Sequence, residues 1–245
     1  MDLEVAFSIV AALMAGIIKT TFGIGAGVFL TPLLSLVLDP KTVVALMAPM
    51  MLITDISTLW LHKNKWDLKY INILTPGFLG GVLAGSYYLA WASPSLTKLT
   101  IGIIAMVFSA YQIIRLKYPN YFSDMNLGTP AGVFLSLVGG MSSAIAHSGG
   151  IIVTIYLVTK NLSKSSFVAT LVGMLFFSDI LKMFTYTKLN LLNKSLLITG
   201  LELTPVLFLG SWLGSKLINK ITEKQFILYV NLLIFISGVI LTVRH

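Results

Sequence analysis

Eight hydrophobic elements alternate with short polar segments along the chain. Most have about the 20 apolar residues that a membrane-spanning helix needs, whereas the first and the fifth are over thirty residues long. The pattern predicts elements at residues 5–38, 41–62, 70–92, 95–115, 128–158, 163–185, 193–217 and 224–243. No polar stretch between them is long enough for a soluble domain. The chain is therefore predicted to be an all-α polytopic membrane protein.

Glycines interrupt both long elements. The breaks contain Gly23, Gly25 and Gly27 in the first element, and Gly149 and Gly150 in the fifth. A straight helix of that length, rising 1.5 Å per residue, would overshoot a hydrocarbon core of about 30 Å. We therefore expect each of these elements to be a broken or re-entrant helix. After the first break, a helix is expected to begin near Ala26.

The two halves of the sequence resemble each other. GIGAGVFLT at 23–31 is echoed by AHSGGIIVT at 146–154, and TPGFLGGVLAGS at 75–86 by TPVLFLGSWLGS at 204–215. We predict two four-element repeats, 1–117 and 128–245, joined by a loop at 118–127. Duplicated hydrophobic halves with corresponding glycine breaks are typical of secondary transporters, whose site lies between the repeats.

Two further features recur in both halves. Gly81 with Gly85, and Gly210 with Gly214, have the spacing that lets membrane helices approach closely. Pro76 and Pro205 are expected to kink their helices.

The basic residues predict how the chain crosses the membrane. If both broken elements return to their starting side, the repeats are inverted and ten Lys and Arg residues share one side against five on the other. The ten are Lys63, Lys65, Lys69, Arg115, Lys117, Lys160, Lys164, Lys216, Lys220 and Lys224. If both broken elements cross, the division is eight against seven. The positive-inside rule favours the inverted arrangement.

Composition agrees with a membrane protein. Charged residues make up 11% of the 245 residues and hydrophobic residues 56%, and the mean hydropathy is +0.91. The net charge of +8 resides mostly between apolar segments, which indicates membrane topology and argues against nucleic acid binding. The chain has no cysteine, and it shows no metal-ligand spacing or catalytic constellation, so we expect neither an enzyme nor a cofactor.

Lys19 lies inside the first apolar element, immediately before the glycine break. An ammonium group there costs several kcal/mol unless it is paired or hydrated. The broken backbone offers amide N–H groups and a helix N-terminus, which attract anions, and Thr20 and Thr21 add hydroxyl donors. These residues predict an anion site. The alternative is that Lys19 lies near the interface and extends its ammonium toward water.

The second break brings further donors, namely Ser142, Ser143, His147 and Ser148. Lys182 lies within the sixth element and would add a second intramembrane cation. His147 is a candidate for binding an oxyanion or for titrating near neutral pH. Its alternative role is a neutral packing residue that is hydrogen-bonded to a backbone carbonyl.

Asp55 and Asp179 occupy equivalent positions of the two repeats, inside apolar elements. They are candidates for proton or cation coupling, or for gating. The alternative for Asp179 is a structural pair with Lys182, three residues further along the same helix. The role of Glu202 is not readable from the sequence.

Several of these motifs together resemble a known family. They are GIIKTTFGIGAGVFLTPLL from residue 16, DISTLWLHKNKWD at 55–67, AHSGGIIVTIYL from 146 and KSSFVATLVGMLFFSDILK from 164. Nearly the whole chain resembles the sulfite exporter TauE/SafE family, also called TSUP. One departure is that Ile151 and Ile152 stand where the family usually has prolines.

The resemblance implies a transporter of sulfite, organosulfonates or related sulfur oxyanions in the cell membrane, driven by or exchanged against an ion. The implied site is Lys19, Thr20, the break from Gly23 to Gly27, His147, Ser148 and Lys182. Lysines, hydroxyls and amides suit a small oxyanion, and alternating access would follow from rocking of the two halves. An anion channel is the alternative function. The sequence leaves the oligomeric state open, a homodimer included.

Overall fold

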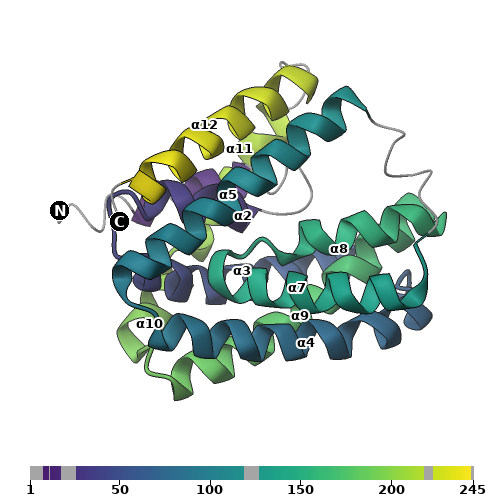
Figure 1. Ribbon diagram of the computed structural model, residues 1–245, viewed down its shortest axis with the longest axis horizontal. Helices are drawn as coiled ribbons and strands as arrows, with labels where there is room; N and C mark the ends of the chain where they lie inside the picture. The colour runs from purple at the N-terminus through teal and green to yellow at the C-terminus, as the bar shows by residue number, and fades with distance from the viewer. Residues whose placement is uncertain (1–7, 11, 18–25, 119–126, 218–222, 244–245) are drawn as a thin grey trace.

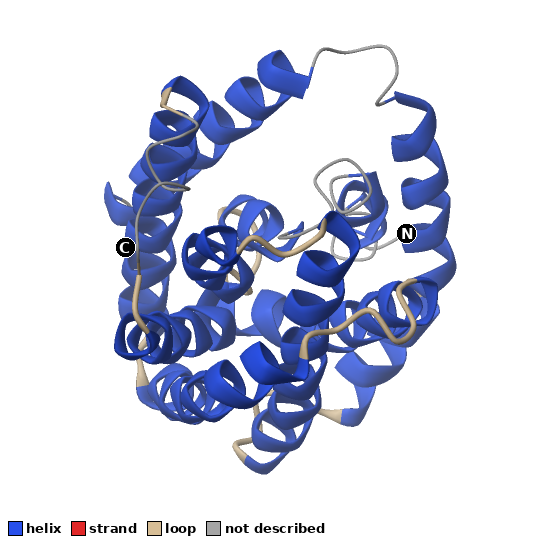
Figure 2. Ribbon diagram, turned by 90° about the vertical axis from the view of Figure 1, so that its right-hand side faces the viewer, coloured by secondary structure: helices blue, strands red, loops and turns tan. Residues whose placement is uncertain are grey.

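The computed structural model describes residues 8–10, 12–17, 26–118, 127–217 and 223–243, and within these ranges it contains helices and no strand (Figure 2). A leading helix (Ser8–Ile17) is followed by α2 (Ala26–Leu34), α3 (Pro40–Leu61), α4 (Leu68–Trp91), α5 (Pro94–Lys117), α7 (Thr129–Ala146), α8 (Gly149–Leu157), η1 (Val158–Lys160), α9 (Lys164–Lys188), α10 (Lys194–Glu202), α11 (Thr204–Leu217) and α12 (Glu223–Val243). Six helical stretches among the described residues are long and apolar enough to cross a membrane. The prediction of an all-α multi-pass membrane protein is confirmed.

Polar residues at the ends of the apolar runs fix where the helices begin. Side-chain oxygens there accept hydrogen bonds from free backbone N–H groups of the first turn, which is the usual N-cap interaction. The capping residues are Asp39 for α3, Asp67 for α4, Ser93 for α5, Ser163 for α9 and Asn193 for α10. Because these caps follow from local sequence, the predicted boundaries of these elements lie within a few residues of the observed ones.

The fifth hydrophobic element is a helical hairpin. α7 ends at Ala146, and His147 adopts a left-handed conformation with φ of 50°. α8 then runs back along α7, since Gly149 lies against the carbonyl oxygen of Gly139 and the ring of Tyr156 lies against Gly132. The turn thus falls just before the glycine pair, and the glycines allow the close return.

The first break, at residues 18–25, lies outside the described residues. The described part of α2, the helix that follows it, starts at Ala26. The seventh hydrophobic element consists of two helices, α10 and α11, with Leu203 between them and Pro205 close behind. Its counterpart Pro76 lies inside α4, which is one continuous helix.

Helices from the two halves of the chain pack on each other. Figure 1 shows α3, α4, α7 and α9 stacked together, with α5 and α12 side by side above them. Apart from the pair α7 and α8, which are neighbours in the chain, the most extensive contacts are those of α4 with α7, of α5 with α12, of α4 with α9 and of α3 with α9. Each of these pairs joins a helix from before residue 118 to one from after it. The halves therefore interleave.

Glycines make three helix contacts close. A methyl group on Gly81 would overlap the carbonyl oxygen of Leu137, and one on Gly140 would overlap that of Phe78. A methyl group on Gly210 would likewise overlap the carbonyl oxygen of Leu13, and one on Gly16 that of Leu207, so α11 lies against the leading helix. A Cβ on Gly102 would lie 2.7 Å from the oxygen of Gly238, and the reverse distance is 2.8 Å. The close approach predicted from glycine spacing is confirmed.

Gly81→Ala is therefore expected to destabilise the protein by about 1–3 kcal/mol or more, because the added methyl group must push α4 away from α7. Gly80→Ala is the matched control, since the space around Gly80 is open to 4 Å. Thermal unfolding in detergent should show a lower midpoint for Gly81→Ala alone. Equal midpoints for the two variants would contradict the close α4–α7 contact.

Hydrogen bonds show which loops share an end of the helical bundle. His62 Nδ1 lies 3.1 Å from Ser165 Oγ, and the backbone N–H of Asp67 donates to Thr170 Oγ1 (2.8 Å). The loop before α4 and the start of α9 are thus neighbours. Lys41 Nζ donates to the carbonyl oxygen of Ala90 (3.0 Å), at the other end of α3 and α4. The inverted arrangement requires the loop before α4 and the start of α9 to lie at the same end of the bundle.

Candidate functional site

The turn between α7 and α8 is buried against α3 and α9. His147 Nε2 lies 3.0 Å from the carbonyl oxygen of Val44. A carbonyl oxygen only accepts, so Nε2 carries a proton and donates it. His147 Nδ1 lies 3.1 Å from Lys182 Nζ and accepts a hydrogen bond from that ammonium group. The ring is therefore neutral and held in one tautomer.

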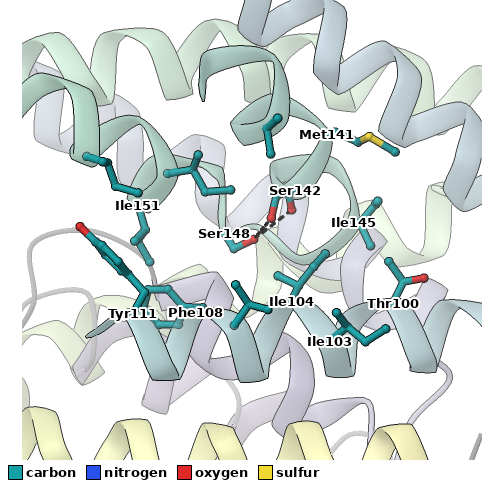
Figure 3. Close-up of a pocket in the computed structure, with 14 residues that line it drawn as sticks. Thr100, Ile103, Ile104, Phe108, Tyr111, Met141, Ser142, Ile145, Ser148 and Ile151 are labelled. Carbon is teal, nitrogen blue, oxygen red and sulfur yellow. Dashed lines mark hydrogen bonds between the residues drawn. The ribbon is translucent and has the colours of Figure 1, made fainter. Parts of the chain in front are cut away.

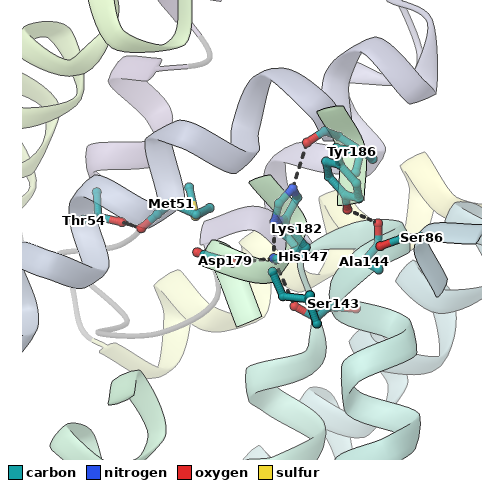
Figure 4. Close-up of polar contacts among 12 residues, drawn as sticks. Met51, Thr54, Ser86, Ser143, Ala144, His147, Asp179, Lys182 and Tyr186 are labelled. Carbon is teal, nitrogen blue, oxygen red and sulfur yellow. Dashed lines mark hydrogen bonds and ion pairs between the residues drawn. The ribbon is translucent and has the colours of Figure 1, made fainter. Parts of the chain in front are cut away.

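Lys182 is the centre of this polar cluster. It is only 1% exposed, although it lies in a helix of membrane-spanning length. Its ammonium contacts Asp179 Oδ1 at 2.5 Å, His147 Nδ1 at 3.1 Å and Ser143 Oγ at 3.2 Å (Figure 4). An ammonium group has three N–H bonds, so these three partners use all of them. The i to i+3 pairing with Asp179, considered as an alternative above, is present.

The same face of α9 holds the end of α7. The hydroxyl of Tyr186 donates to the carbonyl oxygen of Ala144 at 2.5 Å. Thr185 Oγ1 lies 3.2 Å from Ser86 Oγ on α4. Carbonyl groups at a helix C-terminus lack partners within the helix and attract cations. Tyr186 therefore satisfies one of these carbonyls beside Lys182. Tyr186 is not among the residues predicted from the sequence, although its spacing of four residues from Lys182 places it on the same helix face.

Gly27 brings α2 to the second break. A Cβ at this position would overlap His147 Cβ and would lie 3.1 Å from the carbonyl oxygen of His147. Only glycine allows this approach. The part of α2 around Gly27 therefore meets the turn between α7 and α8.

Other predicted residues fall into three groups. Ser142 and Ser148 hydrogen-bond to each other and line an apolar pocket beside α5, away from the Lys182 ammonium. Asp55 is buried on α3, whereas Glu202 is exposed at the end of α10. The residues placed by sequence alone, because they lie outside the described ranges, are Lys19, Thr20, Thr21, Gly23 and Gly25.

A set of three or more His, Asp or Glu side chains suitable for a metal ion does not occur in the described part of the chain. The cluster instead offers a buried ammonium, a neutral imidazole and a hydroxyl, balanced by one carboxylate. An ammonium group and neutral hydrogen-bond donors of this kind can bind an anion when the carboxylate releases the ammonium.

Helices of membrane-spanning length from both halves pack around the buried Lys182 and define a multi-pass membrane protein. The chain belongs to the sulfite exporter TauE/SafE family, because the model of that family matches residues 8–241. Membership of this family assigns it to membrane exporters of sulfur-containing anions. No curated protein and no solved structure matches the chain.

Proposed function

We propose that the protein is a secondary transporter that exports sulfite, an organosulfonate or a related small sulfur oxyanion across the cytoplasmic membrane by alternating access. The observation that carries this proposal is the fully buried ammonium of Lys182 on α9. It lies beside the α7–α8 turn, and α2 packs against the same turn. Charged groups within a membrane are costly and commonly mark substrate or ion pathways. Family membership supplies the chemical class of the anion.

The contacts of Lys182 suggest how an anion binds. Asp179 gives the ammonium one carboxylate oxygen at 2.5 Å, and the other two partners, Ser143 and His147, are neutral. An oxygen of sulfite or of a sulfonate has the same charge sign and the same acceptor character as that carboxylate oxygen. In this proposal the substrate replaces Asp179 as the counter-ion of Lys182, while Ser143 and His147 keep the ammonium in place.

This exchange also provides a route to coupling. A buried carboxylate that loses its cation costs several kcal/mol, and binding a proton or a cation removes that cost. Asp179 is therefore the group that would take up the coupling ion when the substrate occupies Lys182. Asp55, its counterpart in the first half, is the second candidate for coupling or gating.

Alternating access in this proposal comes from two inverted repeats, residues 1–117 and 128–245. The reciprocal glycine contacts support it, because α4 meets α7 as α11 meets the leading helix. The antiparallel return of α8 along α7 also supports it, since a re-entrant hairpin leaves three crossings in the second half. Rocking of one half against the other would expose the midplane site to each side in turn.

Cysteine labelling tests the inverted topology cleanly because the chain has no native cysteine. We expect a membrane-impermeant maleimide to label Lys98→Cys and Lys194→Cys in intact cells. Lys63→Cys and Lys164→Cys should react only after the membrane is permeabilised, as the positive-inside rule requires. Labelling of Lys63→Cys and Lys164→Cys from opposite sides would contradict inverted repeats.

Lys19→Ala tests the part of the site predicted from sequence. We expect it to abolish sulfite uptake into proteoliposomes without loss of folded protein, because the ammonium before the glycine break would bind the anion. Lys41→Ala is the matched control, since Lys41 donates to the carbonyl of Ala90 at the end of the bundle. Normal uptake by Lys19→Ala would remove this residue from the site.

A further inference from the structure

An apolar pocket separates α5 from the α7–α8 hairpin. Its volume is about 440 Å³, within the range of ligand-binding pockets. Isoleucines from both sides make up much of its wall, including Ile103 and Ile104 on α5, Ile145 on α7 and Ile151 on α8 (Figure 3). The pocket is distinct from the Lys182 cluster, which lies on the side of the hairpin that faces α9.

The pocket offers little to a water molecule. Its few polar side chains include Thr100, Ser142 and Ser148, and their hydroxyls are already hydrogen-bonded. Ser142 and Ser148 bond to each other, and Thr100 Oγ1 donates to the carbonyl oxygen of Leu96 (2.8 Å). A buried water needs two to four polar partners, and cavities without them stay dry or bind apolar molecules. The chemistry of the walls therefore favours a hydrocarbon.

The pocket opens onto the exposed apolar surface of α5 and α7. Val107, which is 66% exposed, and Ile103, which is 46% exposed, lie at its edge on α5, and Met141 lies opposite them on α7. α5 and α7 are both of membrane-spanning length and composition. A pocket that opens between them opens into lipid.

The corresponding place in the other half is filled by protein. α12 packs on α2, whereas α5 makes no comparable contact with α8, and the pocket lies between them. If α5 corresponds to α12 and α8 to α2, the contact between α5 and α8 is equivalent to the contact between α12 and α2. A space then takes the place of the first of these contacts. An apolar chain from outside the protein would complete the missing packing.

We propose that this pocket binds one acyl chain of a membrane phospholipid, which enters between α5 and α7 and ends near Ser142 and Ser148. The bound chain fills the space between α5 and the hairpin and so connects lipid contact to the turn that carries His147. The proposal does not depend on which anion the protein transports.

Photo-crosslinking tests it directly. The full-length protein is reconstituted with a phospholipid that carries a diazirine near the end of one acyl chain, irradiated, digested and examined by mass spectrometry. We expect adducts on inner pocket residues such as Ile104, Ile145 and Ile151. Ile104→Trp should reduce the adducts on Ile145 and Ile151 at least fivefold, because the indole fills the pocket. Ile155→Trp, from the α8 wall, serves the same purpose if Ile104→Trp does not fold.

Leu83→Trp on the outer face of α4 is the matched control and should leave the pocket adducts unchanged. Adducts confined to edge residues such as Val107, or pocket adducts that persist in both filled variants, would overturn the proposal. Labelling of the inner residues by a diazirine-bearing alkyl sulfonate but not by the phospholipid would also overturn it, and would assign the pocket to an apolar part of the substrate.

Discussion

Lys182→Met is expected to abolish sulfite transport and to destabilise the protein by about 3–5 kcal/mol. Transport is lost because the cation that binds the anion is gone. Stability is lost because Asp179 becomes a buried charge without its partner, and breaking one side of a buried ion pair has a cost of this size. Uptake into proteoliposomes and thermal unfolding in detergent measure the two effects separately.

A double variant separates the role of Lys182 in folding from its role in binding. In Asp179→Asn/Lys182→Met both charges are removed, and replacing a buried ion pair by neutral groups is often close to neutral for stability. We expect the double variant to recover most of the unfolding midpoint lost in Lys182→Met while transport stays absent. Transport by the folded double variant would show that Lys182 is structural only.

Asp179→Asn alone is expected to lower the half-saturating sulfite concentration at least tenfold, which corresponds to about 1.4 kcal/mol. The reason is that Asp179 competes with the substrate for Lys182, and an amide oxygen competes less well than a carboxylate. Maximal flux should fall, because the Asp179 carboxylate, which would displace the anion from Lys182 during release, is missing. The concentration dependence of initial uptake rates gives both values.

Ser178→Ala provides the control for Asp179→Asn on the neighbouring residue of α9. Ser178 is fully buried, and among the described residues its hydroxyl has no hydrogen-bond partner. We expect its removal to leave both the half-saturating concentration and the flux unchanged. A half-saturating concentration that rises in Asp179→Asn would mean that the carboxylate helps to bind the substrate, contrary to the exchange proposed here.

Much of the fold was predictable because its determinants are local. Apolar runs bounded by capping residues such as Asp67 and Ser163 specify where helices begin, and the spacing of Gly81 and Gly85 indicates a close helix contact. The position of the hairpin turn was less accessible. The glycine pair at 149–150 predicted the break there, whereas the chain turns at His147, whose left-handed conformation is held by tertiary contacts with Val44 and Lys182.

The residues that contact Lys182, namely Ser143, His147 and Asp179, were among those named from the sequence. How the serines divide between the Lys182 cluster and the apolar pocket was not predictable. Ser142 and Ser143 are adjacent, yet successive residues of a helix point about 100° apart. Ser143 therefore reaches Lys182, while Ser142 faces the apolar pocket. The carbonyl of Val44 has no sequence signal, because any backbone carbonyl has the same chemistry. Only the packing of α3 against the hairpin selects it.

The central claim is that the protein is a carrier of sulfur oxyanions, and counterflow tests it most directly. Proteoliposomes are loaded with unlabelled sulfite and diluted into a trace of ³⁵S-labelled sulfite. A carrier with alternating access predicts transient, saturable accumulation of label above equilibrium, which Lys182→Met abolishes. Label that only equilibrates, at a rate that does not saturate, would indicate a channel and contradict the account.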